Sequence, residues 1–168
     1  VPFLEKFINL PFINILFYAI CLSAFINGVN FIDGTNGLAG FSLLASILSL
    51  LFLSLVFNDK EVAILLIYII AILFSFLMFN YPFGKIFLGD LGAYFLGWTI
   101  GSLTIFFMSR NTEVLNWCAL IILSYPTIEV VFSFFRKIII GTKPTSPDRN
   151  HLHLKLFLNH FLLYQHYQ

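Results

Sequence analysis

Charged side chains are scarce in this sequence: they make up 10% of its 168 residues, whereas 60% are hydrophobic. Soluble domains contain about 25% charged residues, and a chain this apolar would expose large hydrophobic patches to water. The shortage of charge therefore excludes an ordinary soluble domain and predicts an integral membrane protein. The formal net charge is only +1, so we expect no nucleic-acid partner.

Cysteine is also rare, and Cys21 and Cys118 both stand inside apolar runs. Two cysteines cannot build the disulfide framework of a small secreted protein, and no CxxC or Cys/His zinc spacing occurs. We expect both to pack as small apolar residues. No basic segment precedes an apolar stretch at the start, so no signal peptide is visible, and we expect a fragment truncated at both ends.

Long apolar runs are what the sequence has in abundance. Hydropathy predicts about five spans, each near the ~20 residues that cross a bilayer as a helix. The runs are continuously apolar, which argues against a membrane barrel and favours helices, whose backbone groups bond internally. The expected fold is all-α: one polytopic membrane domain over 1–168, part of a larger helical bundle. The predicted spans cover residues 12–26, 38–57, 62–79, 91–108 and 114–135.

The connectors between these spans are of two kinds. Those at 58–61 and 109–113 are short and mixed in charge, whereas those at 27–37, 80–90 and 136–155 hold nearly all the Gly, Asn, Asp and His suited to chemistry. Because successive spans alternate in direction, the three long loops must share one face of the membrane. The last of them is rich in Lys and Arg, and this bias predicts that the shared face is cytoplasmic.

The first long loop reads NGVNFIDGTNGL over residues 27–38. It combines carboxamides and a carboxylate with glycines that allow tight turns. Oxygen ligands at this density suit Mg²⁺. A helix C-cap followed by a turn is the alternative, because Asn and Gly also favour such positions.

Asp90 closes the second long loop, at the mouth of a predicted span. An ionisable residue at a membrane boundary indicates a functional site, and Gly89 and Gly92 allow a ligand to approach closely. The alternative is an aspartate that caps a helix N-terminus, where the helix dipole favours a carboxylate.

The third long loop concentrates hydrogen-bond donors at Arg149, His151 and His153, and these could bind phosphate. Histidines at i and i+2 point the same way on an extended segment. A zinc site would lack an obvious third nitrogen or sulfur ligand. A solvated basic loop beside anionic lipid is the alternative.

Three segments resemble the polyprenyl-phosphate N-acetylhexosamine-1-phosphate transferase family: NGVNFIDGTNGL (27–38), KIFLGD (85–90) and DRNHLH (148–153). They occur in the family's order with suitable spans between them, and the resemblance covers essentially the whole chain. It implies transfer of a HexNAc-1-phosphate, or a related sugar-1-phosphate, from a UDP-sugar to undecaprenyl or another polyprenyl phosphate, with release of UMP. The implied location is the cytoplasmic face of the bacterial plasma membrane.

The resemblance also implies roles for individual residues. Asn30 and Asp90 would hold Mg²⁺, with Mn²⁺ as an alternative, and the catalytic set would be Asp33, Asp90, His151 and His153. Phe87 would lie near the uracil ring. Substrate contacts are expected at Asn27, Gly34, Asn36, Asn80, Lys85, Phe87 and Arg149.

The chain also departs from the family's pattern. Asn36 stands where many members have Asp, which weakens a role as a base and fits hydrogen bonding to uracil, and Ala93 stands where many have Ser. The family's paired-aspartate DDxxD motif has no counterpart here. We therefore expect the N-terminal spans to be absent and this fragment alone to be inactive.

Several questions stay open at this point. The resemblance fixes neither the sugar nor a direct or covalent mechanism, and it leaves a homodimer open. A transporter or ion pathway is the main alternative; it would need polar residues deep inside the spans, where only Glu129 comes close. A catalytically inactive family member is the other.

Overall fold

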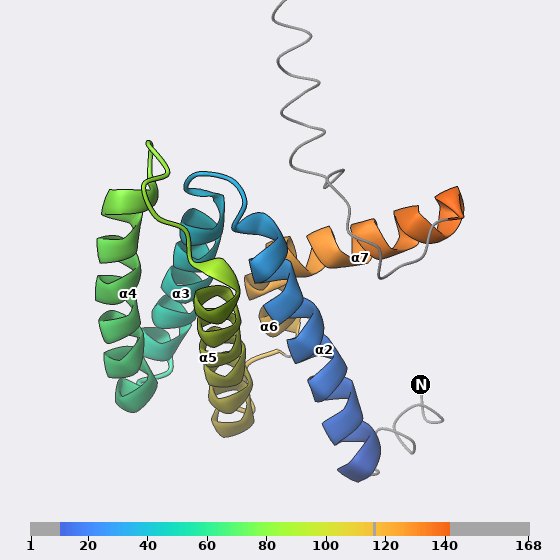
Figure 1. Ribbon diagram of the computed structural model, residues 1–168. Coiled ribbons are helices and arrows are strands. Elements are labelled where there is room, and N and C mark those ends of the chain that lie inside the picture. The colour runs from blue at the N-terminus through green and yellow to red at the C-terminus, as the bar shows by residue number, and fades with distance from the viewer. Residues whose placement is uncertain (1–10, 116, 142–168) are drawn as a thin grey trace, which may run out of the picture.

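The computed structural model of the protein describes residues 11–115 and 117–141 and folds them almost entirely into helices (Figure 1). No strand occurs within those two ranges. The all-α prediction is therefore confirmed. The helices are α2 (Pro11–Ile32), α3 (Leu38–Val56), α4 (Lys60–Asn80), α5 (Gly89–Arg110), α6 (Trp117–Ile122) and α7 (Ser124–Ile140).

Four of these helices, α2 to α5, are long and apolar enough to cross a membrane, with mean hydropathies from 1.5 to 3.0 over their apolar stretches. Charged residues stand only at their ends: Lys60 and Glu61 begin α4, and Asp90 and Arg110 lie in the first and last turns of α5. An α-helix rises about 1.5 Å per residue, so each of these helices is about as long as the hydrocarbon core of a bilayer is thick. The chain is thus a multi-pass membrane protein.

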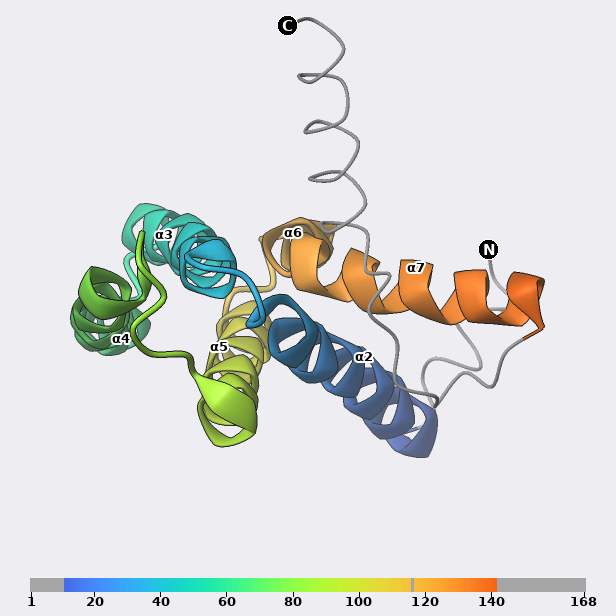
Figure 2. The same ribbon diagram turned by 45° about the horizontal axis from the view of Figure 1, so that its top comes forward.

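The range expected as a fifth span, 114–135, does not form one helix, and the prediction of about five spans is corrected to four within the described ranges. α6 ends at Ile122 and α7 begins at Ser124. Pro126 lies in the first turn of α7; proline has no N–H, and its ring clashes with the carbonyl four residues earlier. The helix therefore breaks before it, and α7 turns aside and runs past α2, away from α3 and α4 (Figures 1 and 2). Hydropathy alone does not register such a break.

α2 packs between α5 and α7, while α3 packs against α4. Small residues of α5 allow the close approach to α2: a Cβ added at Gly97 would stand 3.1 Å from the Cα of Ile26, and one at Gly101 would overlap Leu22. Such spacing of glycines is typical of helix pairs in membranes. Phe25 and Val29 of α2 are fully buried at this interface. The packing brings the last turn of α2 beside the first turn of α5.

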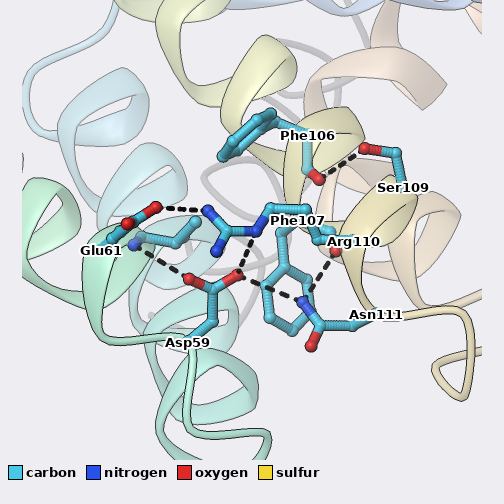
Figure 3. A network of polar contacts seen from close by, with 8 residues as sticks. Asp59, Glu61, Phe106, Phe107, Ser109, Arg110 and Asn111 are labelled. Carbon is cyan, nitrogen blue, oxygen red and sulfur yellow. Dashed lines mark hydrogen bonds and ion pairs between the residues drawn. The ribbon is translucent and has the colours of Figure 1, made fainter.

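The two short turns meet at one end of the bundle (Figure 3). Asp59 accepts a hydrogen bond from the backbone N–H of Val62 at 3.4 Å and caps α4. Its Oδ2 accepts from Asn111 Nδ2 at 3.2 Å and lies 3.6 Å from Arg110 Nε. Arg110 also pairs with Glu61. These contacts fasten the α3–α4 turn to the end of α5.

Asp59→Ala should lower the thermal stability of the full-length protein, and Glu61→Gln should barely change it. The buried Asp59 both caps α4 and contacts the end of α5, and loss of a cap alone costs about 1 kcal/mol. Glu61 is exposed, and exposed ion pairs are screened by solvent. Thermal unfolding of both variants in one detergent would test this; equal shifts would contradict it.

Candidate functional site

The loops at 33–37 and 81–88 lie together at the other end of the bundle from the short turns (Figure 1). Four side-chain hydrogen bonds join one loop, with its flanking residues, to the other. The expectation that the long loops share one face is therefore confirmed for the first two. Most of the third, residues 142–155, lies outside the described residues.

Asn30 and Asp90 form the centre of this end. Asn30 Nδ2 donates to Asp90 Oδ1 at 2.9 Å, although the two residues are 60 positions apart. Asn30 belongs to the last turn of α2 and is half-buried, whereas Asp90 belongs to the first turn of α5 and is exposed. Asp90 is not the cap residue of α5, since that position is Leu88, whose own side chain makes no capping hydrogen bond. Its carboxylate instead faces α2.

Asp33 lies just beyond α2 and is only 7% exposed. Its carboxylate accepts the backbone N–H groups of Leu88 at 3.2 Å and Gly89 at 2.8 Å. The first N–H groups of a helix have no partner within it, so Asp33 satisfies the start of α5 from the opposite loop. Burial raises the pKa of Asp33 above its ordinary range; the two N–H bonds oppose this shift, and the nearby Asp90 charge adds to it.

Asn80 is 2% exposed and connects both loops. Its Oδ1 accepts from Gly37 N at 2.6 Å, and its Nδ2 donates to the carbonyl of Ile86 at 2.7 Å. Its two polar atoms are therefore both used by the backbone. Whether it also contacts a substrate remains a prediction.

Asn36 makes a second connection between the loops. Its Nδ2 donates to the carbonyl of Pro82 at 3.0 Å. Gly84 has a positive φ of 57°, and a Cβ there would overlap the side chain of Asn36. A glycine suits both the left-handed backbone and this close approach. The two asparagines and Asp33 thus fix the relative position of the loops.

The other predicted substrate contacts are less enclosed. Asn27 is exposed, and its Nδ2 donates to Ser23 O within α2 at 2.7 Å. Gly34 and Lys85 are exposed, and Phe87 is 48% exposed. The side chains of Asn27, Lys85 and Phe87 and the backbone of Gly34 are therefore accessible to a ligand. The predicted residues Arg149, His151 and His153 lie outside the described part of the chain.

The donor chemistry of this end fits Mg²⁺. Asn30 and Asp90 place an amide and a carboxylate within hydrogen-bond distance of each other. Mg²⁺ commonly keeps several waters and binds one or two carboxylates together with substrate phosphates. No group of three or more His, Cys, Asp or Glu that could hold a metal forms within 11–115 and 117–141, and Mg²⁺ does not require one. The metal role of Asn30 and Asp90 stays a prediction.

Sequence reasoning did not single out three features of this end. The backbone N–H groups of Leu88 and Gly89 donate hydrogen bonds to the Asp33 carboxylate, and the missing side chain of Gly84 leaves room for Asn36. A signal for Gly84 was available, because a glycine two residues after Pro82 is typical of a tight turn. Nothing in the sequence indicates which amides Asp33 would accept.

Comparison with known proteins identifies the family. The profile of glycosyl transferase family 4 matches residues 1–108, more than half of the chain. The chain therefore belongs to glycosyl transferase family 4. No solved structure gives a significant match.

The curated relatives agree with this assignment. The chain is 31% identical over 142 residues to an undecaprenyl-phosphate alpha-N-acetylglucosaminyl 1-phosphate transferase of Thermotoga maritima, covering 84% of this chain and 42% of the relative. It is 27% identical over 157 residues to a probable undecaprenyl-phosphate N-acetylglucosaminyl 1-phosphate transferase of Bacillus subtilis, covering 93% of this chain and 44% of the relative.

A third relative belongs to another branch. A phospho-N-acetylmuramoyl-pentapeptide-transferase of Dictyoglomus thermophilum is 38% identical over 98 residues, which are 58% of this chain and 31% of the relative. The chain thus spans less than half the length of these three relatives. It is similar to proteins named as sugar-1-phosphate and phospho-sugar transferases, and the expected family is confirmed.

Proposed function

We propose that the full-length protein transfers a HexNAc-1-phosphate, or a related sugar-1-phosphate, from a UDP-sugar to undecaprenyl or another polyprenyl phosphate and releases UMP. The observation that supports this most is the pairing of Asn30 with Asp90, beside Asp33, at one end of four membrane-spanning helices in a glycosyl transferase family 4 chain. Such a site would lie at the membrane surface, where a water-soluble nucleotide sugar and a lipid phosphate can meet.

The proposed reaction needs positioning and charge neutralisation more than covalent chemistry. An oxygen of the lipid phosphate attacks the β-phosphorus of the UDP-sugar, and the bond from that phosphorus to the oxygen of UMP breaks. Mg²⁺, when bound, would neutralise the diphosphate and the departing UMP. Asn30 and Asp90 would hold the ion, and the exposed Lys85 ammonium would bind the diphosphate.

The remaining residues of this end would shape the site. Asp33 orders the backbone at Leu88 and Gly89, directly before Asp90. Phe87 precedes that backbone, and its exposed ring could stack on the uracil base. Asn80 and Asn36 keep the two loops in register. The basic segment at 136–155 makes the cytoplasm the expected side for this end.

A transporter is less well supported. The interiors of α2 to α5 contain no Asp, Glu, Lys, Arg or His. Of the buried hydroxyls there, Ser54 and Thr104 donate to carbonyls of their own helices and Ser46 donates to the carbonyl of Ile122. Glu129, expected close to the end of a fifth span, lies on α7 outside the four spans. The carboxylate and carboxamide side chains of Asn30, Asn80 and Asp90 lie at the ends of the helices, as a reaction at the membrane surface requires.

A product assay tests the proposed function. Full-length protein in lipid nanodiscs with Mg²⁺ and undecaprenyl phosphate should release UMP from one or more members of a UDP-HexNAc panel, and mass spectrometry should find the matching lipid diphosphate sugar. UMP release should require the lipid phosphate. Binding of UDP-sugars without turnover would instead support an inactive family member, and solute flux without UMP release would support a transporter.

A further inference from the structure

The break between α6 and α7 leaves one backbone carbonyl without its helical donor. In a continuous helix, the carbonyl of Ile122 would accept from the N–H of residue 126. That residue is Pro126, which has no N–H. An unpaired carbonyl is costly inside a membrane, where water cannot replace the missing donor. Something else must satisfy Ile122.

Ser46 of α3 supplies that donor. Its Oγ donates to Ile122 O at 2.7 Å across 76 positions of sequence, and Ser46 is 4% exposed. The other serines of α3 that donate a hydrogen bond do so within the helix, Ser49 to Ala45 O and Ser54 to Leu51 O. The bond from Ser46 is therefore the one that joins α3 to the break.

A second close contact holds the other side of the break. Gly28 of α2 is buried, and a Cβ added there would overlap the carbonyl of Pro126. Gly28 stands one residue after Asn27 and two before Asn30, so the first turn of α7 rests on α2 beside the site. The break is thus held from α3 by a hydrogen bond and from α2 by direct backbone contact.

We propose that Ser46 is a positioning residue: by donating to the carbonyl of Ile122 it sets the direction of α7, and so the point from which the third loop begins. α7 has 17 residues, so it is about 25 Å long at about 1.5 Å per residue. A rotation of about 10° at the break would move its far end by about 4 Å. A displacement of about 1 Å in a catalytic group can cost about a hundredfold in rate.

The experiment has a structural arm that does not depend on the function. Spin labels at Leu55→Cys on α3 and Ile139→Cys on α7, both exposed positions, report the direction of α7 in full-length protein in nanodiscs. Other cysteines, including Cys21 and Cys118, are replaced in every sample. Ser46→Ala should shift or broaden the distance distribution by about 4 Å. Ser46→Thr, which keeps the hydroxyl, and Ser49→Ala, which loses a bond within its own helix, should match the parent.

The kinetic arm rests on the proposed transferase activity. Ser46→Ala should lower kcat for UMP release by about a hundredfold, and it should change the KM for the UDP-sugar less, because Asn30, Asp90 and the other residues of the first two loops are untouched. Ser46→Thr, which keeps the hydroxyl, should have the parental kcat. A general loss of stability on changing residue 46 would not separate the two variants in this way.

Two results would overturn the proposal: a parent-like distance distribution in Ser46→Ala, or a Ser46→Thr variant displaced as far as Ser46→Ala. If the parent itself releases no UMP, the proposed function fails, and the distances alone decide the role of Ser46.

Discussion

Asp90→Asn is expected to reduce UMP release by the full-length protein about a thousandfold. Asp90 is the exposed carboxylate of the site, and its contact with Asn30 orients it at the junction of α2 and α5. Charge neutralisation by a metal supplies several kcal/mol to a phosphoryl transfer, and about 4 kcal/mol corresponds to a factor of about a thousand. Asparagine keeps the size of the side chain and removes the charge that holds the ion. UMP release at saturating Mg²⁺ measures the effect.

Glu61→Gln is the matched control for this prediction. It makes the same chemical change at the opposite end of the bundle, in an exposed side chain, and should leave UMP release near the parental rate. Electron paramagnetic resonance of bound Mn²⁺ adds a readout that does not depend on turnover: Asp90→Asn should lose the signal of the bound ion, and Glu61→Gln should keep it. Full activity in Asp90→Asn would refute the metal role.

The sequence alone predicted that the first two long loops lie at the same end of the helices. Each apolar run is visible on its own, so the predicted spans 38–57 and 62–79 lie within two residues of α3 (Leu38–Val56) and α4 (Lys60–Asn80). The alternation of spans then required the first two long loops to share an end. The contact of Asn30 with Asp90 is what that alternation and the family resemblance together predict.

Two features of the fold could not be predicted from the sequence: the helix break at Pro126 and the hydrogen bond that Ser46 makes across it. Hydropathy treated 114–135 as one run, because the effect of Pro126 on the backbone does not change the apolar character of its neighbours. The serine that bonds Ile122 could not be chosen from sequence, since α3 contains Ser42, Ser46, Ser49 and Ser54 at comparable positions. Only the packing of α3 against α6 distinguishes Ser46 from the others.

Asn80 shows the same limit at the site itself. The resemblance implies a substrate contact, whereas the structure shows an amide whose two ends both bind backbone groups. These two roles predict different behaviour before any substrate is added. A side chain that braces the loops is needed for the stability of the unliganded protein, but one that only contacts substrate is not.

Asn80→Ala should therefore destabilise the unliganded full-length protein. It removes the acceptor of Gly37 N and the donor to Ile86 O, and each buried polar group left without a partner costs about 1–3 kcal/mol. The melting temperature should fall by several degrees, whereas Ser75→Ala, which removes an exposed hydroxyl bonded within α4, should leave it nearly unchanged. Thermal unfolding in one detergent, with and without UDP-sugar, measures both. If Asn80→Ala melts like the parent when unliganded and loses only the stabilisation by UDP-sugar, Asn80 is a substrate contact and not a brace.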